Sequence, residues 1–306
     1  MDLGILAQQI FNGLMLGVIY AMIAVGFSLF FGVLDIIKFS HGDVVTVGAF
    51  SGLGAVGLAG GLVVFSPALA LAAGLAAAVA MGSLAGILIG RLLVMPLRHA
   101  PAVNVLLATL MAGTVLRETI RLGVPNGGNP KPFPALLPSG TIATGSFSVG
   151  IDSVMILCAG LSLVFATHLL ITRTRLGLSI RAVAQDGEIA RLSGIDFQRV
   201  VLGTFALGSA LAAFAGCMLG LYYREINFSM GVLLGIIGFA SAVIGGLGSL
   251  LGPIIGGFLF AGVQTLVVVL LPFSSAYKDV VAFAAIIVLI GFFPTGLIAE
   301  RRSERV

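Results

Sequence analysis

The sequence predicts an all-α, polytopic membrane protein, and three observations support this fold class. Hydrophobic residues make up 59% of the 306 residues and charged residues only 9%, whereas a soluble domain is about 25% charged. The apolar residues form about nine uninterrupted runs, and a helix needs roughly 20 such residues to cross the hydrocarbon core. Each run is too long and too continuous for a barrel strand of roughly 10 alternating residues. We therefore expect about 8–10 transmembrane helices, which form one transmembrane domain over residues 1–306.

The apolar runs follow one another along the whole chain, with short polar or Pro- and Gly-containing segments between them. In chain order they cover residues 10–34, 44–64, 67–94, 101–122, 152–172, 200–222, 231–250, 253–272 and 280–299. We expect a helix over each run, because backbone amides in hydrocarbon must be bonded within their own segment. Glycines at helical spacing, as in "GSLLGPIIGG" (248–257), predict helices that approach closely.

The distribution of Lys and Arg predicts the orientation of the chain in the membrane. The segment between the fifth and sixth runs carries the densest group of basic residues, so we expect it to be cytoplasmic. Alternation of the spans then places the N-terminus outside and the C-terminus in the cytoplasm. The basic residues expected inside are Lys38, Arg91, Arg98, Arg173, Arg175, Arg181, Arg191, Arg199, Arg301, Arg302 and Arg305, and those expected outside are Arg117, Arg121, Lys131, Arg224 and Lys278.

A short motif occurs twice in the chain. Residues 37–42 read "IKFSHG" and residues 226–231 read "INFSMG", with Ile, Phe, Ser and Gly identical at a constant offset of 189 positions. An odd number of expected spans separates the two copies, so they would face opposite sides of the membrane. This predicts inverted halves, 1–172 and 200–306, joined by a cytoplasmic segment at 173–199, and such halves commonly place interrupted helices around a transport pathway. Chance similarity is the alternative.

The first copy lies within "LDIIKFSHGD" (34–43), a charged stretch between the first two runs. We expect it to interrupt the helix, with its charges at the cytoplasmic interface. Ionisable residues are nearly absent from the middle of the runs, which argues against a proton- or ion-coupled carrier. Glu118 and Arg121 lie at the outer end of the fourth run, where we expect them to pair at i, i+3.

Signatures of enzymes and of nucleic-acid binding are missing from the sequence. A Walker loop needs Lys after Gly, but no lysine of this chain follows a glycine. His41, His99 and His168 lie on separate segments without the spacing of a zinc site. Cys158 and Cys217 lie inside apolar runs, where a thiol behaves as a small hydrophobe. Basic residues gather at the ends of the runs and not on one face, so we expect no nucleic-acid binding. From the missing motifs we expect no catalytic residues, no metal and no cofactor.

The segment between the fifth and sixth runs has a helical pattern of its own. From Leu178 to Leu192, apolar residues are interspersed with polar and charged residues as in a short amphipathic helix. Gly194 is a suitable C-terminal cap for this helix. A short helix of this kind can dock in the groove of a partner protein. A solvated surface helix that merely follows the positive-inside rule is the alternative.

Three stretches together resemble a known family. They are "NGLMLGVIYAMIAVGFSLFFGVLDIIKFSHGDVVTVGAF" (12–50), "TRLGLSIRAVAQDGEIARLSGID" (174–196) and "AVIGGLGSLLGPIIGG" (242–257). This set is similar to the permeases of branched-chain amino acid ABC importers, in particular the LivH-type subunit, and the resemblance covers nearly the whole chain. Lys38 stands where the family usually has Asn, and Ser40 where it usually has Ala.

The resemblance implies a permease subunit of the bacterial inner membrane that carries Leu, Ile or Val and forms half of the translocation pathway. The implied partners are a second, LivM-like permease, an extracytoplasmic substrate-binding protein and two ABC ATPase subunits. Separate ATPases would account for the missing Walker loop. Urea, short amides and other amino acids are alternative cargoes, and an ion-coupled secondary transporter and a structural membrane subunit are alternative functions.

The resemblance also implies site residues. The surface that couples to the ATPases would consist of Ala182, Gln185, Asp186, Glu188, Ala190 and Gly194. The residues at helix interruptions near the pathway would be Phe39, His41 and Gly42 in the first copy of the motif, and Phe228 and Gly231 in the second.

Overall fold

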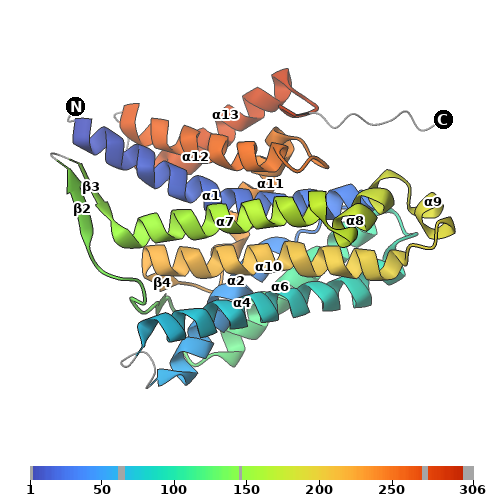
Figure 1. Cartoon of the computed structure of the whole chain (residues 1–306), viewed down its shortest axis with the longest axis horizontal. Coiled ribbons are helices and arrows are strands. Elements are labelled where there is room, and N and C mark those ends of the chain that lie inside the picture. Colours follow the sequence, from blue (N-terminus) through green and yellow to red (C-terminus); the bar gives the residue numbers. More distant parts are fainter. Residues whose placement is uncertain (1–2, 61–65, 145–146, 271–274, 299–306) are drawn as a thin grey trace.

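The computed structural model of the protein describes residues 3–60, 66–144, 147–270 and 275–298. Its long helices lie side by side in one bundle (Figure 1), which confirms the predicted all-α class. Within these described residues, one long helix lies over each apolar run, whereas Arg301, Arg302 and Arg305 lie outside them. These helices are α1 (Leu3–Leu34), α2 (His41–Leu58), α4 (Pro67–Ile89), α6 (Ala102–Gly123), α7 (Ile151–Arg173), α10 (Phe197–Tyr223), α11 (Met230–Gly245), α12 (Gly252–Leu270) and α13 (Lys278–Phe292).

Seven helices in the described part of the chain are long and apolar enough to cross a membrane. The helices α2 and α11 are not among these seven, although sequence analysis expects a span over each of their runs. Both follow a copy of the repeated motif directly, and both are short, with 18 and 16 residues. The difference from the predicted number of spans therefore falls on the two helices that the motif copies precede.

Short elements close the two ends of the bundle. At one end, β2 (Thr141–Thr144) pairs with β3 (Phe147–Gly150), and β1 (Lys131–Pro132) pairs antiparallel with β4 (Glu225–Ile226). At the opposite end lie α8 (Arg175–Gln185) and α9 (Gly187–Leu192), as Figure 1 shows. The helix α4 continues through a π turn, Gly90–Val94, into α5 (Met95–Leu97), and a 3-10 turn at Ser275–Tyr277 precedes α13.

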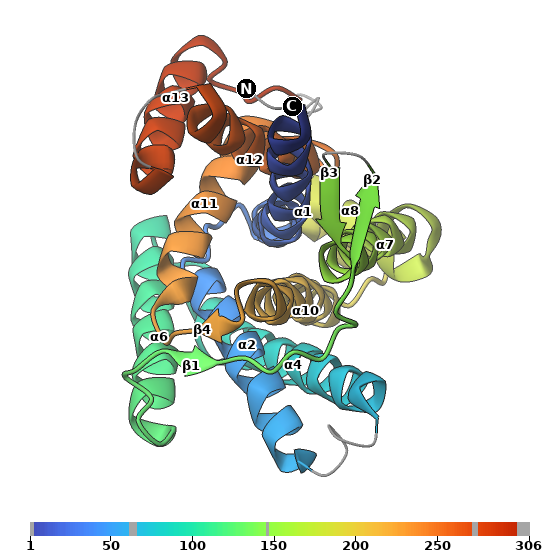
Figure 2. The same cartoon turned by 90° about the vertical axis from the view of Figure 1, so that its left-hand side faces the viewer.

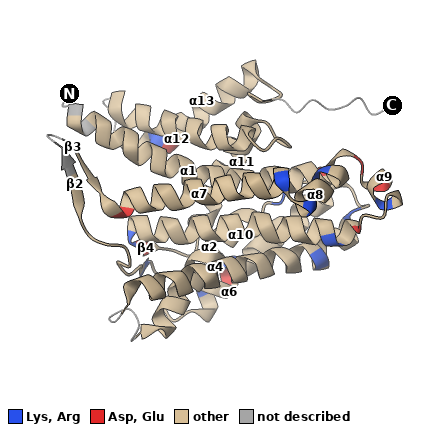
Figure 3. Ribbon diagram, in the orientation of Figure 1, with Lys and Arg blue, Asp and Glu red and all other residues tan. Residues whose placement is uncertain are grey.

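Charged residues gather at the end of the bundle that carries α8 and α9, and few lie along the long helices (Figure 3). Arg173, Arg175, Arg181, Arg191 and Arg199 all belong to this end. A membrane-spanning bundle shows such a distribution because charge is costly in hydrocarbon and cheap at the interface.

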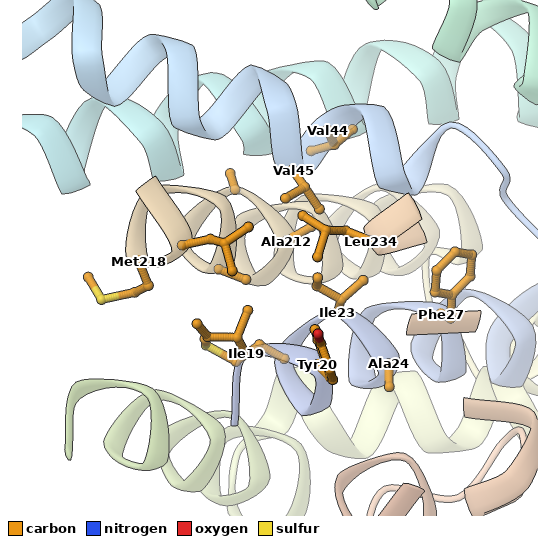
Figure 4. Close-up of a cluster of buried hydrophobic side chains, with 14 of the residues drawn as sticks. Ile19, Tyr20, Ile23, Ala24, Phe27, Val44, Val45, Ala212, Met218 and Leu234 are labelled. Carbon is orange, nitrogen blue, oxygen red and sulfur yellow. The ribbon is translucent and has the colours of Figure 1, made fainter. Parts of the chain in front are cut away.

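The core lies where α1, α2, α10 and α11 meet. Figure 4 shows Ile19 and Ile23 of α1 close to Val45 of α2, Ala212 of α10 and Leu234 of α11. All five side chains are less than one tenth exposed. Because lipid is as apolar as these side chains, it is close packing, and not the hydrophobic effect, that holds the helices together.

The packing of the two halves follows one pattern. The helix α1 packs on α12 in the second half, and α10 packs on α4 in the first half. The helices α1 and α10 also contact each other, as do α2 and α11. Viewed along the bundle in Figure 2, α2 and α4 lie on one side of α10, whereas α12 and α13 lie on the far side of α11.

Candidate functional site

The two copies of the repeated motif share a backbone conformation as well as sequence letters. The helix α2 begins at His41 and α11 at Met230, which is the fifth position of each copy. Asp35 and Arg224, two residues before each copy, have φ of 56° and 57°. Positive φ is uncommon outside glycine, and these are two of the three such residues in the described chain. The same turn at the same offset supports a structural repeat over chance similarity.

The two copies meet at a crossing of α2 and α11, where backbone contacts backbone. A Cβ atom on Gly42 would overlap the carbonyl oxygen of Gly231 and lie 2.8 Å from Cα of Gly235. A Cβ atom on Gly231 would in turn overlap the carbonyl oxygen of Gly42. The backbone N–H of Gly231 donates a hydrogen bond of 3.0 Å to Oγ1 of Thr46. The structure thus brings together Gly42 and Gly231, and only glycine permits this approach.

His41 fixes the depth at which α2 begins. Its side chain is completely buried, and Nε2 lies 3.1 Å from the carbonyl oxygen of Ile23, in the middle of α1. The rings of Phe27 and Phe30 pack against it, with centroids at 4.7 and 5.0 Å. Ile23 lies roughly 16 Å before the end of α1, at 1.5 Å per residue. The segment after α1 therefore turns back into the bundle before α2 starts.

Two charged residues of the stretch 34–43 are buried inside the bundle, so the prediction that the charges of this stretch face an interface is wrong for these two. Lys38 is 0% exposed and Asp43 6% exposed. The ammonium of Lys38 donates to Oγ of Ser209 at 3.0 Å and lies over the rings of Phe30 and Phe205. Both residues come from the segment between the first two runs, and not from the middle of a run.

Asp43 and Arg117 form an ion pair of 2.9 Å between α2 and α6. Replacing Asp43 with Asn is expected to lower the free energy of unfolding by about 1–3 kcal/mol, because a mostly buried charged hydrogen bond is lost. Thermal unfolding of the purified protein in detergent measures this change. The exposed pair of Glu118 and Arg121, 3.0 Å apart as predicted, provides the control: Glu118→Gln should cost under about 1 kcal/mol. Equal effects of the two substitutions would contradict this assignment.

Lys38 has no carboxylate partner within ion-pair distance among the described residues. A buried charge without a counterion is costly, and replacing such a charge with an apolar side chain of similar length is often neutral or stabilising. Lys38→Met is therefore expected to keep or raise the unfolding temperature. Ser209→Ala, which removes the hydroxyl acceptor and leaves the ammonium in place, should lower it. The opposite order of the two unfolding temperatures would show that the ammonium itself stabilises the fold.

The helix α6 contacts both motif copies. Arg117 pairs with Asp43 directly after the first copy, and the guanidinium of Arg121 lies 5.7 Å from the ring centroid of Phe228 in the second copy. The ring of Phe39, in the first copy, packs at 5.8 Å from Phe239 on α11. Phe39 and Phe228 are both partly exposed, so they border the crossing without being sealed inside it.

A cavity of about 540 Å³ lies beside the second copy, at the end of the bundle that carries β4. Its apolar wall consists of Leu219, Met230, Leu233, Leu234 and Ile237. Its polar side consists of Tyr20, Tyr223, Glu225, Asn227, Ser229, Lys278 and Asp279. Three lining residues, Asn227, Ser229 and Met230, belong to the second copy of the motif. The others come from α1, α10, β4, α11 and α13, and no spacing in the sequence indicates that they meet.

The predicted coupling segment is folded as two helices, so the prediction of one continuous helix is wrong at Asp186. Its carboxylate accepts hydrogen bonds from the backbone N–H groups of Glu188 and Ile189, at 2.8 and 2.9 Å, and thereby caps α9. Gly194 has φ of 84°, and its N–H donates to the carbonyl oxygen of Arg191 at 2.9 Å. This confirms the expected glycine cap at the end of the segment.

Most of the predicted coupling residues lie together at the surface. Gln185, Asp186, Glu188 and Gly194 are exposed, and Ala182 is half-buried. Ala190 is only 4% exposed, so it lies under this surface and anchors α9. Two apolar residues of α9, Ile189 and Leu192, are 61% and 88% exposed.

A second cavity, of about 370 Å³, adjoins the coupling residues. Arg98 and His99 line it from before α6, although they are distant in sequence from the coupling segment. The guanidinium groups of Arg191 and Arg98 lie 4.2 and 6.0 Å from the ring centroid of Phe197. This cavity therefore presents two cations next to the carboxylates of Asp186 and Glu188.

Comparison with known proteins places these features in a family. The model of the family "Branched-chain amino acid transport system / permease component" matches residues 9–290. The high-affinity branched-chain amino acid transport system permease protein BraD of Pseudomonas aeruginosa is 33% identical over 303 residues, which cover 98% of this chain and 97% of that protein. The corresponding permease protein LivH of Escherichia coli is 32% identical over the same length. The xylose transport system permease protein XylH of Escherichia coli is 34% identical over 99 residues, 30% of this chain and 25% of that protein. No solved structure matches. The chain is a multi-pass membrane protein that belongs to the family of branched-chain amino acid transport system permease components, and it is a transport permease and not an enzyme.

Proposed function

We propose that the chain is a permease subunit of an ABC importer for branched-chain amino acids and forms half of the translocation pathway. The crossing of α2 and α11 at Gly42 and Gly231 is the observation that carries this proposal. Helices that begin inside a bundle are typical of transport pathways, because their free backbone groups need protein or water around them. Family membership supports the cargo, since relatives matched over nearly the whole chain are named for branched-chain amino acid transport.

The two halves of the chain, 1–172 and 200–306, are inverted repeats in this proposal, joined by the segment 173–199. The shared turn at Asp35 and Arg224 and the reciprocal packing of α1 on α12 and α10 on α4 support the repeat. The repeat also accounts for the motif: each half supplies one helix whose first turn lies in the bundle. The backbones of these two helices close the pathway where they cross.

A second, LivM-like permease supplies the other half of the pathway. Near the crossing, Val232, Leu233 and Ile236 of α11 are 38%, 45% and 47% exposed. Figure 2 shows α11 at the edge of the bundle, between α6 and α13. Few residues of α6 and α13 are buried in the chain itself. A pathway that opens along this side needs a partner to enclose it.

The coupling segments of this chain and of the second permease contact two separate ATPase subunits at the cytoplasmic end. The segment of this chain presents a surface suited to docking in a groove of a partner. The surface combines exposed polar residues with exposed apolar ones, namely Gln185, Asp186, Glu188, Ile189 and Leu192. The basic residues at this end support its position in the cytoplasm. The chain then spans the bacterial inner membrane with its N-terminus on the outer side and its C-terminus in the cytoplasm. An extracytoplasmic substrate-binding protein then delivers the amino acid at the end that carries β1 to β4.

Assembly and stimulated ATPase activity test the proposed function. The chain is co-expressed with the candidate second permease and ATPases, and the complex is purified in lipid nanodiscs. We expect a stable complex whose ATP hydrolysis rises when leucine-loaded binding protein is added, because loaded binding protein signals through the permeases. The proposal would be refuted if no complex formed, or if the rate of ATP hydrolysis did not change when the loaded binding protein was added. Binding protein loaded with urea or a short amide tests the alternative cargoes.

A further inference from the structure

We infer that the 540 Å³ cavity beside the second motif copy binds a zwitterionic amino acid with a branched aliphatic side chain, directly before the crossing of α2 and α11. This inference deepens the proposed function and rests on it. A zwitterion requires an anion and a cation at one end of its site and an apolar wall for its side chain. The cavity offers all three.

The charged groups of the cavity come from two places. Lys278 and Asp279 begin α13, and Glu225 belongs to β4. The side chains of Lys278 and Glu225 make no hydrogen bond or ion pair with any other described residue. Their charges are therefore available to a ligand. Lys278 would bind the carboxylate of the amino acid, and Glu225 and Asp279 would bind its ammonium group. An anionic side chain would meet the same two acidic residues, so the cavity disfavours glutamate.

Asp279 is held in place by its neighbour. Nε2 of Gln264 donates a hydrogen bond of 2.5 Å to Oδ1 of Asp279, and Gln264 itself is only 3% exposed. One carboxylate oxygen is thus fixed, and its orientation is set before a ligand arrives. A charged group that is already oriented costs less to engage on binding.

The apolar wall faces the crossing. Leu234 and Ile237 of α11 are 6% and 2% exposed, and Leu233 is 45% exposed. Leu234 lies between Gly231 and Gly235, the two glycines of α11 that contact Gly42. An aliphatic side chain packed on this wall would lie next to the closed point of the pathway. Opening of the crossing would then admit the amino acid without further movement along the wall.

Protection of a single cysteine from a water-soluble maleimide tests this inference. Leu233→Cys is introduced into the assembled importer in nanodiscs, in a background with Cys158→Ala and Cys217→Ala. We expect L-leucine to slow the reaction at least roughly fivefold, because a bound ligand covers the thiol of a pocket. L-glutamate, and leucinamide, which lacks the carboxylate, should leave the rate unchanged. The control is Thr141→Cys, exposed on β2 at the same end of the bundle, where leucine should have no effect.

A second substitution separates binding in the cavity from a change elsewhere. Lys278→Met should raise the leucine concentration needed for half-protection about tenfold, since a charged hydrogen bond is lost. Equal reaction rates of the Leu233→Cys protein with and without leucine, in a complex that retains ATP-driven uptake, would overturn the inferred site and leave the proposed function standing. If the complex of the unsubstituted chain showed no ATP-driven uptake at all, both the proposed function and this inference would be refuted.

Discussion

Gly42→Val is expected to abolish amino acid uptake while the chain still inserts into the membrane. A Cβ atom at this position overlaps the carbonyl oxygen of Gly231, and backbone, unlike a side chain, cannot rotate away. Overpacking of this kind typically costs about 1–3 kcal/mol, and the helices must separate or shift at the point that closes the pathway. We expect uptake by the reconstituted complex to fall at least roughly tenfold, since about 1.4 kcal/mol corresponds to that factor.

A matched substitution in the same helix controls for general damage to α2. Gly54→Val lies in α2, and a Cβ atom there would meet nothing within 4 Å. Uptake by this variant should stay close to that of the unchanged protein. Gly231→Val should reproduce the loss from the other side of the crossing. Full uptake by the Gly42→Val protein, at equal amounts of inserted chain, would contradict a role of the crossing in transport.

Glu188→Arg is expected to uncouple the complex from its ATPases. Glu188 is exposed in the first turn of α9, and a positive charge there opposes the helix dipole by only about 0.3–1 kcal/mol. The fold of α9 should therefore survive, whereas like charges juxtaposed across an interface cost several kcal/mol. We expect at least roughly a tenfold loss of ATP-dependent leucine uptake, together with weaker retention of the ATPases during purification of the complex.

Gln198→Arg is the matched control for this charge reversal. Gln198 is exposed in the first turn of α10, at the same end of the bundle, but outside the predicted coupling surface. It adds a positive charge in an equivalent helical position and should leave both uptake and assembly near normal. If Gln198→Arg impaired uptake as strongly as Glu188→Arg, the effect would be one of overall charge at this end, and the coupling surface would lose its support.

Long apolar runs are the part of the fold that the sequence predicts best. All the runs form helices, because each contains enough apolar residues to satisfy the backbone within one segment. The repeated motif also predicts where two of these helices begin, at His41 and Met230. Which runs cross the membrane completely is harder to predict, since hydropathy does not show how deep in the bundle a helix starts.

The interior placement of Lys38 and Asp43 could not be predicted from their own sequence neighbourhood. Both lie next to a helix interruption, where charges usually face water. Their burial depends on distant residues, Ser209 on α10 and Arg117 on α6, which accept or supply the compensating hydrogen bonds. Pairing of this kind is a tertiary property, and no spacing in the chain encodes it.

The coupling segment shows the opposite case, where a local signal was present. Asp186 precedes Gly187 and has Glu188 in the first turn that follows, which is a typical beginning of a new helix. The apolar pattern around it is regular enough to suggest a single helix. The local cap prevails because it satisfies two backbone N–H groups that a continuous helix would bond to carbonyl groups one turn earlier.

Uptake of labelled leucine into proteoliposomes tests most directly whether the chain is half of an ATP-driven pathway. The vesicles contain this chain with its candidate second permease and ATPases, and they are supplied with the binding protein. We expect uptake that requires ATP and the binding protein and that persists when proton and sodium gradients are collapsed. Uptake that proceeds without ATP and follows an ion gradient would contradict the importer function, and a carrier mechanism would replace it.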